Sequence, residues 1–573
     1  MVTNKYITRI ASVIMAAAVI LCLMASLFSD KLQEVYGNNA VTMKYESKLF
    51  NTDQIMDIDI LMDEDDWNNM LENAISEEYY SCNVVVNGKT FYSVGIRPKG
   101  NTSLSSIAND PDTDRYSFKL EFDHYIEGQT CYGLDKLILN NNYADATNMK
   151  EAIVYDMYQY LGVDASLYNY AKISVNGDYR GVYLALEAVE DSFMLRNYGT
   201  EDGNLYKPES MGIGGGVDGN GFPQKGEMPD GEDFPQKGEM PDGEDFPQKD
   251  EMPDGEDFPQ MGEAPNGEAA DIKMGIMGGN GGADLNYTDD DLDSYSTIWD
   301  GEITDSDKKD HKRVVEALKN ISEGTDLETY MDVDNILKYM AVHTFVVNDD
   351  SLSGTMAHNY YLYEYNGKLN ILPWDYNLSF GGMSMGGKMG GQSLGATSVI
   401  NDAIDTPFSI TNFFDALLEN EEYLEQYHGY LNELVEKYVN GGEFEKTYER
   451  IRSQIDDLVG NDPTAFYSYE EYEEAANMLI EVVQLRAKSV SGQLAGTIPS
   501  TDEGQQQDSS NLIDGSDIDL SVMGSFSGGG GGNEGQGKDN GFAGTPQPFD
   551  AGDVSPISEE KADLQDSNQD SVK

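Results

Sequence analysis

Residues 348–382 read NDDSLSGTMAHNYYLYEYNGKLNILPWDYNLSFGG. Two runs in this stretch, Tyr360–Tyr365 and Lys368–Leu372, alternate aromatic or aliphatic side chains with polar ones. They flank Asn366-Gly367, a dipeptide typical of the type I′ turn that joins two antiparallel strands. The stretch therefore predicts a tight β-hairpin, and residues just outside its two strands should meet at its open end.

Carboxylates and carboxamides gather at that open end. They are Asp349, Asp350, Asn359, Asp375 and Asn377. Mg²⁺ prefers hard oxygen ligands, commonly one or two carboxylates together with phosphate oxygens. A site with Asp375 and an Asn carboxamide could therefore hold a Mg²⁺–nucleotide, which leaves Asp350 available as a base.

The register of the hairpin decides which amide joins Asp375. Strict pairing about the turn places His358, not Asn359, opposite Asp375. Asn359 shares the site only if its strand is bulged or ends near Pro373. Otherwise Asn377 is the candidate ligand.

The charge of the chain limits its partners. Among 573 residues, 103 are acidic and 37 are Lys or Arg, which gives a formal net charge of −66. Such a surface repels phosphate backbones, so we expect no nucleic-acid partner, whereas cations or basic protein segments would be attracted. The three cysteines exclude a disulfide framework. Cys22 lies in an apolar run, and the sequence leaves open whether Cys82 pairs with Cys131.

The N-terminus has the pattern of an export signal. Lys5 and Arg9 precede an uncharged apolar run, Ile10–Phe28, of about membrane-spanning length. We interpret residues 1–29 as an uncleaved signal anchor in the membrane, with a cleaved signal peptide as the alternative. Either interpretation places the remaining chain on the extracellular face of the cell membrane or in a secreted form.

Short alternating runs between residues 53 and 123 predict a small antiparallel sheet. They are Met56–Met62, Cys82–Val86, Phe91–Arg97 and Tyr116–Phe122, with a helix near 65–75. Between two of these runs lies the basic turn RPKGNTS, residues 97–103, whose backbone N–H groups, hydroxyls and cations suit an anion such as phosphate. A plain hairpin turn with a surface Lys is the alternative for this segment. A solvated Lys is likewise the alternative for Lys119.

Two segments have compositions that cannot form a core. A twelve-residue unit, FPQKGEMPDGED, begins at Phe222, recurs at Phe234 and, with one change, recurs at Phe246. It is poor in apolar residues, so we expect residues 209–283 to be a disordered acidic insertion that sets spacing, attracts a basic partner or varies neutrally in length. Residues 499–573 are rich in Ser, Asp, Gln and Gly, and we expect a disordered tail there.

Several motifs, in their order along the chain, resemble a known family. They are IRPKGNTS, YSFKLEF, LILNNNYADATNMKEA, ISVNGDYRGVYLALE, NLYKP, HNYYLY and LPWDYNLSFGG. Together they are similar to the CotH (spore coat protein H) kinase family. The resemblance implies an α+β, atypical protein-kinase-like fold. Its antiparallel-sheet lobe would comprise residues 30–208, and its mostly helical lobe would comprise residues 284–498.

The same resemblance implies an activity. Members of the family transfer phosphate from ATP to Ser residues of secreted or coat proteins, and phosphoryl transfer uses Mg²⁺ or Mn²⁺. We therefore expect an exported protein Ser/Thr kinase that acts on secreted, cell-surface or spore-coat proteins. A non-catalytic surface or spore-coat scaffold with the same domain is the alternative. A glycoside hydrolase with a carboxylate pair at the hairpin is a third class, but it gives no role to the RPKGNTS turn.

Carried over by motif, the catalytic and metal-binding roles fall on the hairpin. Asp350 would accept the proton of the substrate hydroxyl, although the adjoining Asp349 leaves that choice open. Asp375 would bind the metal ion. The second metal ligand would be Asn359 or, depending on the register, Asn377.

The nucleotide-binding roles fall on the N-terminal strands. By the resemblance, Lys119 would contact the phosphates. Glu151, near the start of a helix expected over 146–161, is a candidate for its ion-pair partner. The other nucleotide-binding candidates are Arg97, Lys99, Asn101, Ser103 and Glu187.

Overall fold

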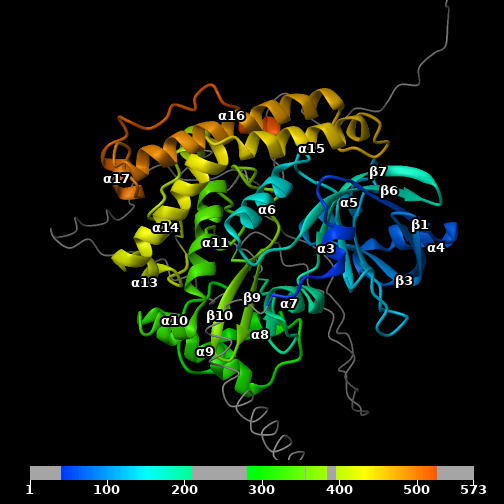
Figure 1. The fold of residues 1–573 in the computed structure, drawn as a ribbon, viewed down its shortest axis with the longest axis horizontal. Helices are drawn as coiled ribbons and strands as arrows, with labels where there is room; N and C mark the ends of the chain where they lie inside the picture. Colours follow the sequence, from blue (N-terminus) through cyan, green and yellow to red (C-terminus); the bar gives the residue numbers. More distant parts are fainter. Residues whose placement is uncertain (1–39, 210–280, 355–356, 384–394, 409, 525–573) are drawn as a thin grey trace, which may run out of the picture.

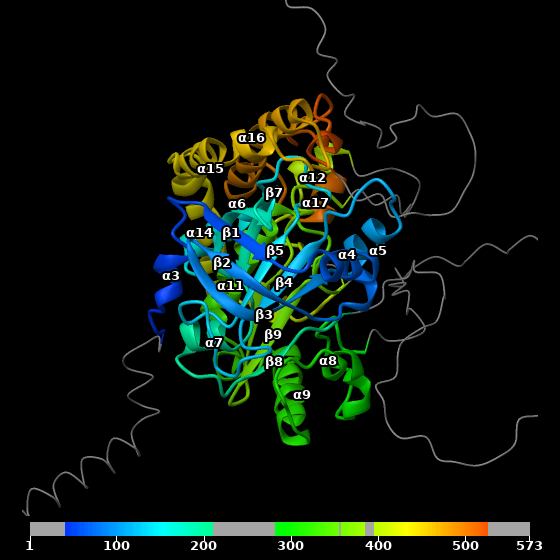
Figure 2. The same ribbon diagram turned by 90° about the vertical axis from the view of Figure 1, so that its right-hand side faces the viewer.

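The computed structural model describes residues 40–209, 281–354, 357–383, 395–408 and 410–524 (Figure 1). The predicted signal anchor, residues 210–280 of the predicted insertion and residues 525–573 of the predicted tail lie outside the described residues. None of the helices in the described part of the chain is long and apolar enough to span a membrane. The described chain has a mixed α+β fold, with a β-barrel on one side and a helical region on the other (Figures 1 and 2).

Seven strands form the barrel. They are β1 (Met56–Leu61), β2 (Tyr80–Val86), β3 (Lys89–Lys99), β4 (Ser117–Glu121), β5 (Lys136–Asn140), β6 (Tyr168–Val175) and β7 (Asp178–Glu187). The order around the barrel is β1-β2-β3-β4-β5-β7-β6. All neighbours are antiparallel except β1 and β6, which pair in parallel from Met56↔Ala171 to Ile60↔Val175.

The closed barrel corrects the antiparallel sheet lobe that we predicted. Alternation located the strands, because side chains such as Ile58, Val84 and Ile96 all lie in the buried interior. It could not show that β1 and β6, far apart in the sequence, would meet edge to edge. Closure pairs the backbone groups that an open sheet would leave exposed at its edges.

The predicted hairpin is present and belongs to a second, three-stranded sheet. Its strands are β9 (Tyr360–Tyr365) and β10 (Lys368–Pro373), and the φ angles of Asn366 and Gly367, +54° and +86°, fit a type I′ turn. β8 (Asn204–Tyr206) pairs with the other edge of β9. The chain before the insertion and the chain after it therefore contribute strands to one sheet.

Helices form the rest of the described fold. Before the insertion they are α3 (Lys44–Lys48), α4 (Glu64–Glu72), α5 (Thr102–Ala108), α6 (Lys150–Leu161) and α7 (Asp191–Tyr198). After it they are α8 (Ser296–Asp300), α9 (Lys308–Ser322), α10 (Leu327–Tyr330), α11 (Val333–Val346), α12 (Ala396–Ile400), α13 (Asp415–Leu418), α14 (Glu421–Glu433), α15 (Glu443–Gly460), α16 (Tyr469–Leu494) and α17 (Asp502–Gln507). Three further segments are 3-10 turns, η1 (Ala74–Ser76), η2 (Leu292–Tyr295) and η4 (Leu520–Met523), and η3 (Leu434–Val439) is a π-helical segment that follows α14.

The helical region is joined to the barrel along one side. α15 and α16 run across the top of both parts in Figure 1. The Tyr179 hydroxyl on β7 donates to Leu458 O at 3.0 Å. Between α15 and α16, Asp462 forms an ion pair with Arg115 at 2.7 Å, and each of the two side chains is only 2% exposed. These contacts fix the barrel against the helices.

Residues 499–524, which we expected to lie in a disordered tail, pack on the helical region instead. Gln505 Nε2 donates to Asn401 O at 2.7 Å, and Ala146 N donates to Met523 O at 3.1 Å. Met523 is buried against the main hydrophobic core. The polar composition of this segment pointed to disorder, but hydrogen bonds to the fold and one buried side chain hold it in place.

Cys82 and Cys131, whose pairing the sequence left open, are both buried free thiols. Both lie in the hydrophobic core of the barrel. Burial raises the pKa of each thiol to about 12, so both stay protonated at neutral pH.

Candidate functional site

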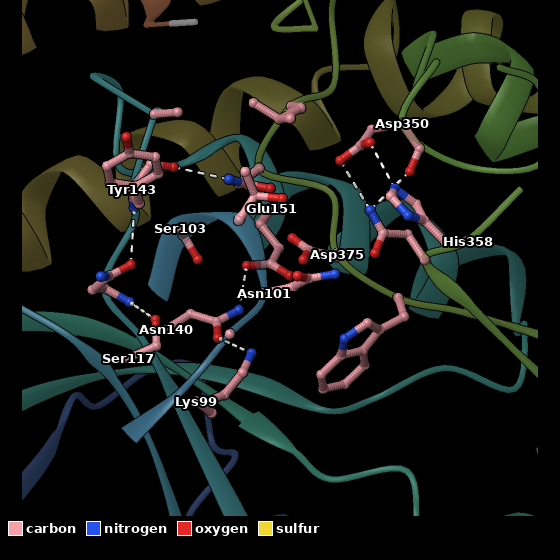
Figure 3. A pocket seen from close by; sticks show the side chains of 18 of the residues that line it. Lys99, Asn101, Ser103, Ser117, Asn140, Tyr143, Glu151, Asp350, His358 and Asp375 are labelled. Carbon is pink, nitrogen blue, oxygen red and sulfur yellow. Dashed lines mark hydrogen bonds and ion pairs between the residues drawn. The ribbon is translucent and has the colours of Figure 1, made fainter. Parts of the chain in front are cut away.

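A cavity of about 380 Å³ lies between one end of the barrel and the open end of the hairpin (Figure 3). Residues 99–103, residues 140–144 and Glu151 line it on the barrel side. The side chains that line it around the hairpin are Asp350, His358, Asn359, Trp374, Asp375 and Asn377. The basic turn and the acid-and-amide cluster, far apart in the sequence, therefore share one space.

The hairpin opens directly at this cavity. Its two strands stop pairing at Pro373↔Tyr360. Asn359 lies directly before Tyr360, and Asp375 lies two residues after Pro373. Their φ angles of +58° and +61° are in the left-handed region that Asn and Asp adopt more readily than most residues. The strand thus ends at Pro373, and Asn359 lines the cavity together with Asp375, as one of the two expected arrangements required. His358 also lines the cavity.

Asp350 is held at the cavity wall by two neighbours. His358 Nε2 lies 2.8 Å from Asp350 Oδ1, and Asn359 Nδ2 donates to Asp350 Oδ2 at 3.0 Å (Figure 3). Among the described residues that line the cavity, Asp350 is present and Asp349 is not. Burial, together with the charge of Asp350, raises the pKa of Asp349. Of the two adjacent acids, Asp350 is the one placed to accept a proton from a molecule in the cavity.

Asp375 and two amides offer oxygen atoms on the same side. Burial raises the pKa of Asp375. Asn359 Nδ2 already donates to Asp350, and Asn377 Nδ2 donates to Tyr143 O at 2.8 Å. These bonds use the NH₂ group of each amide and leave its carbonyl oxygen for another partner. The carbonyl oxygens of Asn359 and Asn377 are therefore available as ligands.

These oxygen atoms suit a divalent cation whose other ligands are substrate phosphates and waters. Within the described residues, no group of three or more His, Cys, Asp or Glu side chains could hold a metal ion. Mg²⁺ is commonly bound by one or two carboxylates, with substrate phosphates and waters completing its shell. Asp375, with the carboxamide oxygen of Asn359 or Asn377, matches that pattern.

The basic turn lies on the opposite wall. Lys99 ends β3, and its Nζ donates to Asn140 Oδ1 at 3.1 Å (Figure 3). Burial lowers the pKa of Lys99. Gly100 has φ +136°, and a Cβ there would lie 2.9 Å from Ser103 Oγ, so glycine allows the turn to fold this tightly. Asn101 and Ser103 both line the cavity. The segment therefore lines the cavity.

Lys119, the predicted phosphate contact, lies outside the cavity. The strand register places Ser117 opposite Lys99 and Lys119 opposite Arg97. Ser117 lines the cavity, whereas Lys119 is two residues further along β4 and forms an ion pair with Glu190. Alternation showed which face of the strand these residues share, but not which end of that face meets the cavity.

Of the two remaining nucleotide-binding candidates, Arg97 and Glu187, only Arg97 lies at the cavity. Arg97 lines the cavity, and its guanidinium forms an ion pair with Glu77. Glu187 is fully buried elsewhere, where it accepts hydrogen bonds from Arg196 Nε at 2.9 Å and Nη2 at 2.6 Å. Both carboxylate oxygens of Glu187 are therefore engaged, and the structure does not bring this residue to the site.

Two cavity residues form a connection that the sequence did not reveal. Asn140 Oδ1 accepts from Lys99, while Asn140 Nδ2 donates to Glu151 Oε2 at 2.8 Å, so the amide bridges the two charged groups. Glu151, considered as a partner for Lys119, is thus linked to Lys99 instead. Burial, reinforced by the charge of Asp375, raises the pKa of Glu151 to about 8. The three consecutive Asn residues that begin at the end of β5 were the available signal.

One family model matches most of the chain. Residues 96–490 match the CotH family model, whose description is CotH kinase protein. This range includes Lys99, Glu151, Asp350 and Asp375, and it ends within α16. Comparison with curated proteins gave no match.

Proposed function

The chain belongs to the CotH kinase protein family, and on that basis we propose that it transfers the terminal phosphate of ATP to a Ser or Thr hydroxyl of a protein substrate. The observation that carries the proposal is the convergence of a basic turn, a set of oxygen ligands and an oriented carboxylate on one cavity. Phosphoryl transfer depends on groups that hold phosphates, groups that hold a metal ion and a residue that orients the attacking hydroxyl. We also propose that the barrel side and the helical side correspond to the two lobes of a protein kinase, with the phosphates bound on the barrel side.

The phosphate-binding groups are the residues of the basic turn. The Lys99 ammonium and the Ser103 hydroxyl face the cavity and can donate to phosphate oxygens. Lys99 takes the role that we first assigned to Lys119. A hydrogen bond between two charged groups is stronger than one between neutral groups, so Lys99 should contribute most to ATP affinity.

Asp350 is the proposed base. The substrate hydroxyl oxygen forms a bond to the terminal phosphorus as the bond from phosphorus to the ADP oxygen breaks, and Asp350 takes the hydroxyl proton. His358 and Asn359 contact one carboxylate oxygen each, so the carboxylate is held in a fixed direction. Each oxygen retains a further lone pair for the incoming proton.

Asp375, with Asn359 or Asn377, would hold Mg²⁺ or Mn²⁺. When bound, the ion supplies positive charge that stabilises the phosphate oxygens during transfer. We also propose that the protein acts outside the cytoplasm, on secreted, cell-surface or spore-coat proteins. Support for export comes from the apolar stretch Ile10–Phe28 behind two basic residues. The acidic repeats remain a candidate contact for a basic partner.

Phosphate labelling tests the proposed function. The full-length protein is incubated with terminally labelled ATP, Mg²⁺ or Mn²⁺ and a Ser-rich peptide. We expect Asp375→Ala to abolish labelling and Asp350→Asn to lower it at least about 100-fold, as is typical when a general base is lost. Asp349→Asn is the matched control, because it removes the adjacent acid that does not line the cavity. Equal labelling by wild type and Asp375→Ala, or none by either, would favour the non-catalytic scaffold.

A further inference from the structure

Glu151 is a buried carboxylate with one oxygen atom that accepts no side-chain hydrogen bond among the described residues. It lies in the first turn of α6, is 3% exposed and lines the cavity. Asn140 Nδ2 donates to Oε2, and a backbone hydrogen bond from Tyr376 opposes the rise in the pKa of the carboxyl, whereas Oε1 is buried and accepts no side-chain hydrogen bond among the described residues. A buried polar atom without a partner costs free energy, and native proteins rarely contain one without a functional reason.

The cations of the cavity wall do not supply that partner. Lys99 Nζ donates to Asn140 Oδ1, so the Asn140 amide stands between this ammonium and Glu151. The other Lys and Arg side chains among the described lining residues already form ion pairs at the cavity, Arg97 with Glu77 and Lys207 with Glu209. The protein therefore places an unpaired carboxylate oxygen of Glu151 beside the space where a substrate would lie.

A second carboxylate faces the same space. Glu151 and Asp375 both line the cavity, and they are close enough for the charge of Asp375 to raise the pKa of Glu151 (Figure 3). Two ionised carboxylates that share a site repel each other unless a positive charge lies between them. One or two carboxylates together with nucleotide phosphates are the usual protein environment of Mg²⁺ in phosphate-transfer sites.

We propose that Glu151 is a ligand of the divalent cation, with Oε1 and the Asp375 carboxylate binding the same ion. The inference rests on the proposed function, because the nucleotide supplies the remaining oxygen ligands. It gives Glu151 a role other than that of an ion-pair partner for a Lys. Asn140 becomes a positioning residue, because its bond to Oε2 leaves Oε1 for the ion.

Binding of Mn²⁺ tests this assignment without measuring phosphate transfer. Mn²⁺ is titrated into the full-length protein in the presence of a non-hydrolysable ATP analogue, and the free ion is followed by electron paramagnetic resonance. We expect Glu151→Gln to weaken Mn²⁺ binding at least about tenfold, because even losing a residue that only supports a ligand costs 10–100-fold. Glu77→Gln removes a carboxylate from the same cavity wall and should leave Mn²⁺ affinity nearly unchanged.

The outcomes separate this inference from the proposed function. If wild type binds neither Mn²⁺ nor the analogue, the proposed function fails. If wild type binds both and Glu151→Gln binds Mn²⁺ equally well, or if Glu77→Gln weakens binding as much, Glu151 is not a ligand.

A melting curve recorded without metal checks that the variant folds. We expect Glu151→Gln to melt at a higher temperature than wild type, because its side chain is neutral. Should it fail to fold, Glu151→Asp replaces it, and undiminished Mn²⁺ binding by that variant would also overturn the assignment.

Discussion

Lys99 and Lys119 lie on the same face of the β3–β4 pair, but at different positions along the strands, and their surroundings differ. Lys99 lines the cavity and donates to Asn140, whereas Lys119 forms an ion pair with Glu190. Glu190 also pairs with Lys136, so Lys119 belongs to a small charge cluster away from the cavity. At the scale of the single residue, position along the strand separates a phosphate-binding role from a structural one.

Exchanging each Lys for Met should separate these roles. We expect Lys99→Met to lower kcat/KM for ATP about 10- to 100-fold, because a hydrogen bond to a charged group contributes about 1.5–3 kcal/mol. Lys119→Met should lower the melting temperature slightly and leave kcat/KM for ATP unchanged. Steady-state kinetics at varied ATP concentration measures both variants. The reverse result would restore the phosphate contact to Lys119.

Asp135 should make stability depend on pH. It is 7% exposed, and burial raises its pKa from 3.8 to about 6. Because the folded protein holds this proton more tightly than the unfolded chain, the contribution of Asp135 favours folding below about pH 4 and is lost as the pH rises through 6. Asp135→Asn should therefore melt higher than wild type at pH 8, by up to about 3 kcal/mol of unfolding free energy, and the difference should shrink toward pH 4. Melting curves from pH 4 to 8 measure it, and a difference independent of pH would contradict the assignment.

At the scale of the element, the hairpin depends on its turn. Gly367 has φ +86°, and a Cβ there would meet no atom within 4 Å, so backbone strain alone opposes a larger residue. Gly429 lies in the exposed middle of α14 and also has open space around it. The same substitution should therefore have opposite effects at these two positions.

We expect Gly367→Ala to lower the free energy of unfolding by about 1 kcal/mol, because a left-handed conformation is unfavourable for alanine. Gly429→Ala should raise it by about 0.5–1 kcal/mol, because alanine favours the helical conformation. Thermal unfolding of both variants beside wild type measures the pair. Two shifts of the same sign would show that local backbone preference does not govern stability at these two positions.

Periodicity in the sequence predicted elements well where one face is buried. β10 ends one residue later than expected, because Pro373 still pairs with Tyr360 across the hairpin. β5 was not predicted, since its apolar residues form a continuous run. α6 begins at Lys150 rather than near 146, because the Asp145 carboxylate bonds the backbone N–H groups of Thr147 and Lys150 and holds a loop there.

The sequence predicted those site residues that lie close together along the chain. The hairpin brings Asn359 and Asp375 together through nearby residues, so the sequence located them. The roles of Lys99 and Glu151 depend on the neighbouring strands β3, β4 and β5 and on the Asn140 amide between the two charged groups. The contact between Lys99 and Asn140 joins residues 41 positions apart, and no short-range pattern encodes it.

At the scale of the whole molecule, residues 499–524 connect the two walls of the cavity. Met523 O accepts from Ala146 N, two residues from the cavity-lining Ala144. Leu520 lies so close to Gly381, beyond the hairpin, that a Cβ there would be 3.0 Å from Leu520 Cδ1. This segment lies beyond the range matched by the family, 96–490. It contacts a loop from the barrel side and a loop from the hairpin side.

Removing that segment should loosen both walls at once. We expect the free energy of unfolding of a chain ending at residue 498 to be about 1.5–3 kcal/mol lower than that of a chain ending at 524, because the shorter chain lacks the buried Met523 side chain. Its melting temperature should also rise less on addition of Mg²⁺–ATP, because a ligand that binds more weakly stabilises the folded state less. Met523→Ala in the full-length protein should reproduce part of the first effect while keeping the backbone bond to Ala146. Equal melting and equal nucleotide response of the two truncated chains would show that residues 499–524 rest on the fold without holding the cavity together.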